Sequence, residues 1–144
     1  MKADVKTETE VMKVLNRSLE CYKKKDVDEM VSLFASDPDV VCIGTGEDEK
    51  RAGLKEIRIQ FERDFSQCDN ISCELGWHTV SAAGIVAWVA ADYSVHATIK
   101  GQKEEMTMRM SIVLERRGQK WLIVHMHGSL PMAGQEAGES FPSK

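Results

Sequence analysis

Two histidines near the end of the chain have a spacing that suits a shared chemical role. Residues 121–129 read WLIVHMHGS, and alternate side chains of an extended strand point to the same face. One face would therefore carry Trp121, Ile123, His125, His127 and Ser129. Such a face is apolar at one end and polar at the other, as the lining of a small-molecule pocket is.

The chemistry open to this histidine pair is proton transfer, hydrogen bonding or metal binding. Zinc would need at least a third protein ligand. The candidates Asp92, His96 and His78 lie on other predicted strands of unknown register. We therefore predict no metal and no cofactor, and the two imidazoles are either pocket groups or structural residues.

Two charged residues interrupt otherwise apolar strands in the second half of the chain. Arg109 lies in a ladder whose alternate face is rich in methionine, and Asp92 shares a face with Trp88. If the methionine face packs under the helices, Arg109 is an ordinary solvent-facing residue. If the other face lines the cavity, the buried guanidinium needs an anionic partner, which is either Asp92 or a carboxylate on a bound ligand. The predicted ligand-binding set is Trp88, Arg109, Ser111, His125 and His127, with Asp92 as an ion-pair partner or an acid/base group.

The elements that must position these residues follow from hydrophobic periodicity. Helices are predicted from Thr7 to Tyr22, with Thr7 as the N-cap, from Asp26 to Phe34 and from Leu54 to Phe65. A short strand, 40–43, precedes four long ones over 71–81, 85–99, 104–116 and 120–129. This order predicts an α+β fold, in which three N-terminal helices pack on a curved antiparallel sheet and leave a cone-shaped cavity.

Bulk properties narrow the class of protein further. The 144 residues fit one domain over 1–130, followed by a Gly- and Ser-rich tail over 131–144 that we expect to be mobile. A net charge of −4 with scattered basic residues argues against nucleic-acid binding. No apolar run is long enough for a membrane span, and the polar opening residues predict a cytoplasmic protein. The four cysteines are expected to be reduced thiols.

Several separated motifs together resemble the nuclear transport factor 2-like superfamily, in its SnoaL-like and ketosteroid-isomerase-like branch. They are the helix junction from Lys25 to Ala35, the segment VCIGTG from Val41 to Gly46, Gly53 with Ile57 and Asp64-Phe65, and the strand 121–129. The resemblance implies a cone-shaped α+β barrel, with a mixed or antiparallel sheet and a ligand pocket at its wide end. It favours the face of Arg109 as the one that lines the cavity. It also implies a homodimer formed through the outer face of the sheet.

The resemblance does not extend to the machinery of ketosteroid isomerases. In those enzymes a carboxylate base lies on the first short strand and a tyrosine of the first helix donates to the enolate oxygen. The matching positions here are Cys42 or Ile43 for the base and one near Ser18 for the tyrosine. Neither a thiol or alkyl group nor a serine hydroxyl replaces them well, so steroid isomerisation by that route is disfavoured.

Three functions are consistent with these features. The first is binding of a small organic ligand, anionic if it pairs with Arg109, in a pocket lined by the predicted set. The second is an isomerase, dehydratase or cyclase with His127 or Asp92 as general base and no metal. The third is an oligomerisation module in which the pocket has no role, since one fold serves many functions.

Overall fold

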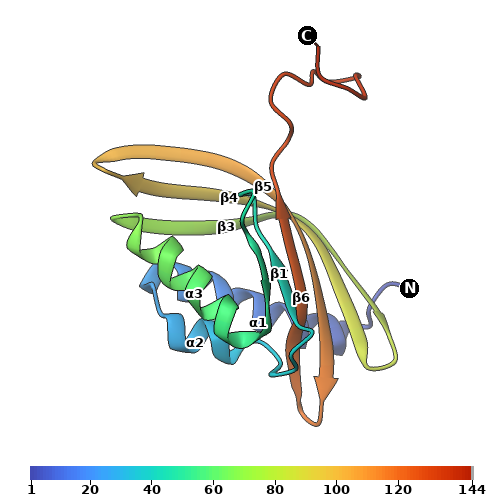
Figure 1. Cartoon of the computed structure of the whole chain (residues 1–144). Helices are drawn as coiled ribbons and strands as arrows, with labels where there is room; N and C mark the ends of the chain where they lie inside the picture. The colour runs from blue at the N-terminus through green and yellow to red at the C-terminus, as the bar shows by residue number, and fades with distance from the viewer. Residues whose placement is uncertain (144) are drawn as a thin grey trace.

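A computed structural model describes residues 1–143, which form three helices and a six-stranded sheet (Figure 1). The helices are α1 (Val5–Lys24), α2 (Val27–Ser32) and α3 (Gly53–Ser66). The strands are β1 (Val41–Ile43), β2 (Lys50–Ala52), β3 (Asn70–Ala83), β4 (Val86–Ile99), β5 (Gln102–Arg117) and β6 (Lys120–Ser129). The α+β class is confirmed, and the sheet bends strongly without closing into a barrel. The stretch 130–143 contains turns and no regular element, and its mobility stays a prediction.

The first two helices begin at aspartate caps. The Asp4 carboxylate accepts a hydrogen bond of 2.7 Å from the backbone N–H of Thr7, so α1 begins at Val5. Thr7, which we predicted as the N-cap, therefore lies inside the helix. Asp26 caps α2 as predicted, accepting from the Glu29 N–H at 3.0 Å. Lys25 joins the two helices in the left-handed conformation, with φ of 53°, which turns the chain sharply.

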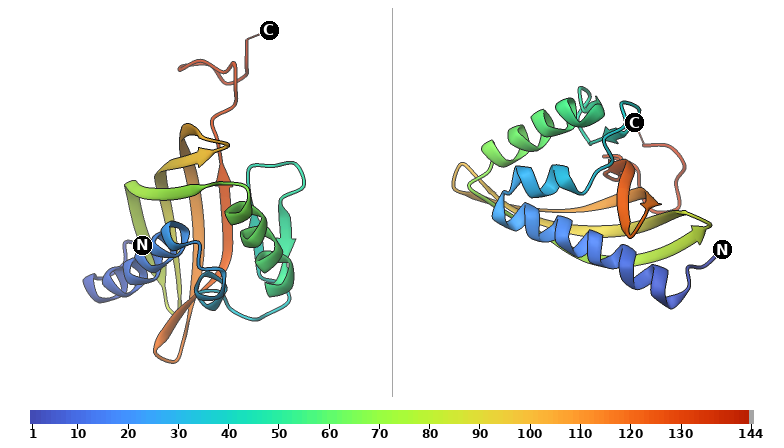
Figure 2. Two further views of the ribbon diagram at one scale, coloured as in Figure 1. Left: turned by 90° about the vertical axis from the view of Figure 1, so that its left-hand side faces the viewer. Right: turned by 90° about the horizontal axis from the view of Figure 1, so that it is seen from below.

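The sheet order is β2-β1-β6-β5-β4-β3, with β1 parallel to β6 and the other neighbours antiparallel. The sheet is thus mixed, which is one of the two arrangements that we predicted. The three-residue strand β2 was not predicted, because a charged segment this short has no detectable period. The helices all lie on one side of the bent sheet (Figure 2).

The hydrophobic core lies between the helices and the sheet. Its largest fully buried side chains come from every layer and include Leu15, Met30, Ile57, Ile112, Leu114 and Ile123. The Trp121 indole is buried beside them, and its Nε1–H donates to the Glu10 carboxylate of α1 at 2.9 Å. This contact satisfies the polar atom of the indole.

A β-bulge in β6 decides which face the histidines occupy. Ile123 pairs with Leu114 and His125 pairs with Val113, so Val124 is an extra residue with no partner on β5. The extra residue reverses the alternation of side chains. Trp121 and Ile123 are buried in the core, whereas His125 and His127 point to the opposite face. Our prediction that all these residues share one face is therefore wrong.

No helix among the described residues is long and apolar enough to cross a membrane. The four cysteines are free thiols.

Candidate functional site

A cavity of about 400 Å³ lies between the helices and the concave face of the sheet. We call it the main cavity. Four methionines of β5 and β6 line one part of its wall: Met106, Met108, Met110 and Met126. The polar residues of its wall include Ser18, Tyr22, Thr45, Glu49, Gln60, Asp64, Gln67 and Tyr93. Most of the lining is therefore apolar and deformable, with a few polar groups.

The charged groups of the main cavity are acidic. Glu49 and Asp64 are the carboxylates in its lining, and no lysine, arginine or histidine of the described chain lines it. An anionic ligand would find no opposite charge in this wall.

Asp64, on α3, is the carboxyl group whose proton affinity the cavity alters most. Burial raises its pKa above the ordinary value of 3.8, and the hydrogen bond from Gln60 opposes part of that effect. The Gln60 Nε2–H donates to Asp64 Oδ1 at 2.7 Å. A carboxyl group with a raised pKa, held in one orientation beside a cavity, is a candidate acid/base group.

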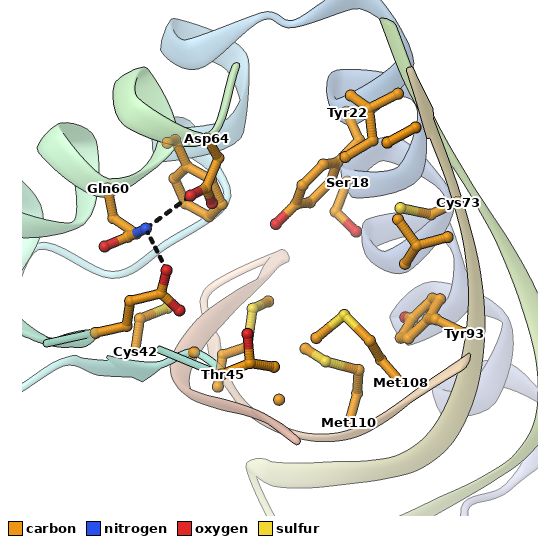
Figure 3. Close-up of a pocket in the computed structure, with 18 of the residues that line it drawn as sticks. Ser18, Tyr22, Cys42, Thr45, Gln60, Asp64, Cys73, Tyr93, Met108 and Met110 are labelled. Carbon is orange, nitrogen blue, oxygen red and sulfur yellow. Dashed lines mark hydrogen bonds between the residues drawn. The ribbon is translucent and has the colours of Figure 1, made fainter. Parts of the chain in front are cut away.

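Two phenol hydroxyls face the same cavity from other elements. Tyr22 projects from α1 and Tyr93 from β4 (Figure 3). Neither hydroxyl has a hydrogen-bond partner within residues 1–143. Burial raises the pKa of Tyr93 to about 12 and that of Tyr22 well above its usual 10. Both phenols therefore stay protonated and are available as hydrogen-bond donors.

The position of Tyr22 is fixed by aromatic packing. Its ring meets the rings of Phe61 and Phe65 edge to face, with centroids 5.9 and 5.4 Å apart. Ser18, one helical turn earlier, donates its own proton to the Leu15 carbonyl at 2.6 Å. Tyr22 is thus the better donor on this helix face.

Two cysteine thiols in the cavity wall are unreactive at neutral pH. Burial raises the pKa of Cys42 to about 12 and that of Cys73 to about 11. Because the thiolate is the reactive form, these cysteines contribute apolar surface at neutral pH. Cys42 holds no negative charge there, so it does not act as the carboxylate that ketosteroid isomerases carry at this position.

The predicted site residues lie on the other face of the sheet. Strand pairing places Asp92 opposite Arg109, Ser111 opposite His127, and Trp88 and His125 on either side of Val113. All six point away from the main cavity. The expectation that they line the cone is wrong, because the alternation along β4 and β5 turns their methionine and tyrosine neighbours inward and the bulge at Val124 turns both histidines outward.

Four of the six predicted residues do meet, in a shallow hollow on that outer face. The hollow measures about 240 Å³ and includes Asp92, Arg109, Ser111 and His127, with Trp77 at its side. The ion pair proposed between Asp92 and Arg109 is not formed within the described chain. The Arg109 guanidinium instead donates to the Leu130 carbonyl at 3.1 Å. Trp88 and His125 lie outside the hollow.

The sequence reasoning missed Tyr22, Asp64 and Tyr93 as site residues. Tyr22 is four residues after Ser18 and so shares its helix face, which was a usable signal. Asp64 belongs to the Asp64-Phe65 motif, but a single carboxylate on an amphipathic helix is most often a surface charge. Tyr93 follows Asp92 on β4 and therefore lies on the opposite face, and alternation alone does not say which face borders the cavity.

The part of the chain from 1 to 143 contains no group of three His, Cys, Asp or Glu side chains placed to hold an ion.

The chain belongs to the SnoaL-like domain family, whose sequence profile matches residues 11–133. No curated protein matches it. Among solved structures, a nuclear transport factor 2-like superfamily protein from Salmonella enterica serovar Typhimurium is 23% identical, with a TM-score of 0.84 over 96% of this chain and 100% of that one. These matches confirm the superfamily resemblance.

Two further solved structures show the same fold. A candidate dehydratase of this superfamily from Streptomyces avermitilis is 18% identical, with a TM-score of 0.81 over 90% of this chain and 100% of that one. A candidate calcium/calmodulin-dependent protein kinase II association domain from Xanthomonas campestris is 26% identical, with a TM-score of 0.76 over 86% and 87%. Proteins given such different names share one fold, so function has to be argued from the site.

Proposed function

We propose that this domain binds a small, neutral, largely apolar organic molecule in the main cavity. The observation that carries the proposal is a cavity of about 400 Å³ whose wall is mostly apolar and sulfur-bearing and holds no basic side chain. A volume of this size suits a ligand of up to about three rings. The anionic ligand inferred from Arg109 is not part of this proposal, because that guanidinium lies on the outer face.

The polar groups of the cavity indicate where the ligand carries its heteroatoms. Asp64 offers an acceptor from α3, while Tyr22 and Tyr93 offer donors from α1 and β4. A ring compound with a carbonyl or hydroxyl oxygen would accept from the phenols. Its acidic hydrogen would then face Asp64.

Substitutions at two adjacent residues of β6, Gly128 and His127, test where the ligand binds. A Cβ atom at Gly128 would lie 2.8 Å from Met110 Sδ and 2.9 Å from Met108 Cε. In Gly128→Val the methionine ends are therefore forced into the main cavity. We expect this variant to bind N-phenyl-1-naphthylamine, a neutral fluorescent probe, at least about tenfold more weakly, which corresponds to about 1.4 kcal/mol.

The matched control is His127→Val, which adds the same side chain one residue earlier on the outer face. Titrations followed by fluorescence should give this variant the affinity of the unmodified protein. If His127→Val lost binding and Gly128→Val retained it, the ligand site would be the outer hollow and the proposal would be wrong.

A second candidate function, acid/base catalysis, is favoured by the arrangement of Asp64 and Tyr22. In this role Asp64 removes a proton next to a carbonyl group, and the Tyr22 phenol donates to the oxygen that becomes an enolate. Asp64 takes the place of His127 and Asp92, since neither of those reaches the cavity. The likeness to a candidate dehydratase is compatible with such chemistry.

The outer face of the sheet is the surface that we propose for a homodimer. Trp77 is 62% exposed there, and Trp88 and His125 on the same face are half-buried. Large exposed aromatic residues are typical of protein interfaces. We expect sedimentation equilibrium at micromolar concentration to give the mass of two chains. Trp77→Lys should shift the protein toward monomer, and a monomeric unmodified chain would contradict the proposal.

A further inference from the structure

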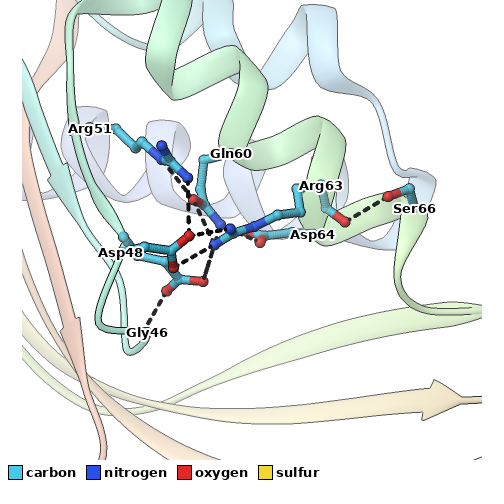
Figure 4. A network of polar contacts seen from close by, with 8 residues as sticks. Gly46, Asp48, Arg51, Gln60, Arg63, Asp64 and Ser66 are labelled. Atoms are coloured by element: carbon cyan, nitrogen blue, oxygen red, sulfur yellow. Dashed lines mark hydrogen bonds and ion pairs between the residues drawn. The ribbon is translucent and has the colours of Figure 1, made fainter.

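A buried amide on α3 links the cavity carboxyl group to a neighbouring loop. The Gln60 side chain is only 8% exposed. Its Nε2–H groups donate to Asp64 Oδ1 at 2.7 Å and to Glu49 Oε1 at 3.2 Å. Its Oε1 accepts from Arg51 at 2.9 Å and from Arg63 at 3.2 Å (Figure 4). All of its hydrogen-bonding groups are used, and the charges around it allow only one orientation of the amide.

The loop 44–49 is held against α3 by the same cluster. Arg63 pairs with Asp48 at 2.7 Å and with Glu49 at 3.0 Å. Glu49 also accepts from the Gly46 N–H at 2.8 Å, which fixes the shape of the loop. The loop connects β1 to β2 and lines the main cavity with Gly44, Thr45 and Glu49. The contacts that hold this loop against α3 therefore help to define the cavity wall.

We propose that Gln60 is a positioning residue that couples the seating of the loop 44–49 on α3 to the state of the Asp64 carboxyl group. The inference adds regulation to the site of the proposed function and rests on it for its biological meaning. When the loop leaves α3, Glu49 leaves the amide, and one N–H of a buried side chain loses its acceptor. An N–H group without an acceptor costs free energy in a partly buried network. The Gln60 amide therefore reorients, and its hydrogen bond to Asp64 changes.

The charges that face Asp64 set the direction of the coupling. Glu49, from the loop, raises the pKa of Asp64 by repulsion, whereas Arg63 and Arg51 lower it. Tyr22 on α1 and Cys42 on β1 also face this carboxyl group, and both are neutral at pH 7. Removing Glu49 from its seat therefore lowers the pKa of Asp64. By reciprocity, loss of the Asp64 proton favours release of the loop.

Asp48→Asn in the ligand-free protein tests the coupling, because Asp48 touches the loop ion pair and neither Gln60 nor Asp64. Its side chain is 68% exposed, so the variant should fold. We expect the amides of Gly46 and Glu49 to exchange hydrogen at least about fivefold faster. The ¹³C NMR titration of the Asp64 carboxyl should shift to a lower pKa. Asp28→Asn, which breaks the Arg58 ion pair on the same helix, should change neither quantity.

Asp48→Asn is then made in a Gln60→Leu background. The direct electrostatic effect of the Asp48 charge on Asp64 is equal with and without Gln60, so any difference between the two backgrounds measures the coupling through Gln60. The Asp64 shift caused by Asp48→Asn should be clearly smaller there, because the part that passes through the amide is lost and only the direct charge effects remain. A shift of equal size in both backgrounds would overturn the proposal, as would faster loop exchange with an unchanged Asp64 titration. If Gln60→Leu failed to fold, equal Asp64 titrations in Asp48→Asn and Asp28→Asn would still overturn it. No ligand is used, so a failure of cavity binding would be recognised separately.

Discussion

Replacing Asp64 with asparagine is expected to slow proton abstraction in the main cavity by at least about 100-fold. The measurement is hydrogen–deuterium exchange at the α-carbon of 2-tetralone in D₂O, followed by ¹H NMR with and without protein. The asparagine amide has nearly the shape of the carboxylate but cannot accept a proton. In the unmodified protein the rate should rise with pH through the raised pKa of Asp64 and then level off, because the base form is the active one.

Two substitutions on the outer face serve as controls for this experiment. Asp92→Asn and His127→Gln remove the bases that sequence reasoning had selected, and both should leave the exchange rate unchanged. Protein-dependent exchange that survived Asp64→Asn and was lost with either control would assign the base to the outer hollow. The absence of any protein-dependent exchange would leave ligand binding as the proposed function and remove catalysis of this type.

The stability of Asp64→Asn separates loss of the base from loss of the fold. Because burial raises the folded-state pKa of Asp64 above 3.8, the folded protein binds more protons than the unfolded chain between these two values. The contribution of Asp64 to stability therefore falls as pH rises through that window. Urea unfolding should show Asp64→Asn at least as stable as the unmodified protein at pH 7, and this relative gain should vanish below pH 3.8.

Replacing Leu114 with alanine is expected to destabilise the fold by about 2–5 kcal/mol. Leu114 is fully buried in the hydrophobic core and does not line the main cavity. The methyl groups lost in the alanine variant would therefore leave a new cavity. Met108 lies on the same face of β5, six residues before Leu114. It borders the main cavity and is only half-buried. Met108→Ala should cost about 1 kcal/mol or less, since it enlarges an existing space.

Urea unfolding of the two alanine variants at equal protein concentration measures this contrast. It tests whether the space under the wide part of the sheet is hollow. Equal destabilisation by both substitutions would mean that Met108 packs as tightly as Leu114, and the main cavity would then be filled by side chains. The slope of the unfolding free energy against urea should be unchanged in both variants, because the folded surface is nearly the same.

The fold was predictable because its signals are local. The Asp26 cap, the helical spacing of Leu54, Ile57, Phe61 and Phe65 and the alternation along β4 all act within a few residues. Together with the resemblance carried by the motifs in residues 25–65 and 121–129, they determined an α+β arrangement of helices on a curved sheet. The element bounds differ by a few residues, and only the short β2 was missed.

The site was not predictable in the same way, because it depends on which face of each strand meets the helices. The sequence determined that chemically active and apolar side chains alternate along β4, β5 and β6. The β-bulge at Val124 reverses the alternation in β6, so the side chains of His125 and His127 lie on the outer face. Alternation fixes only relative faces. The tertiary structure chose the face, because it turns the more apolar side of β4 and β5 toward the helices, and so it placed Tyr22, Asp64 and Tyr93 around one cavity.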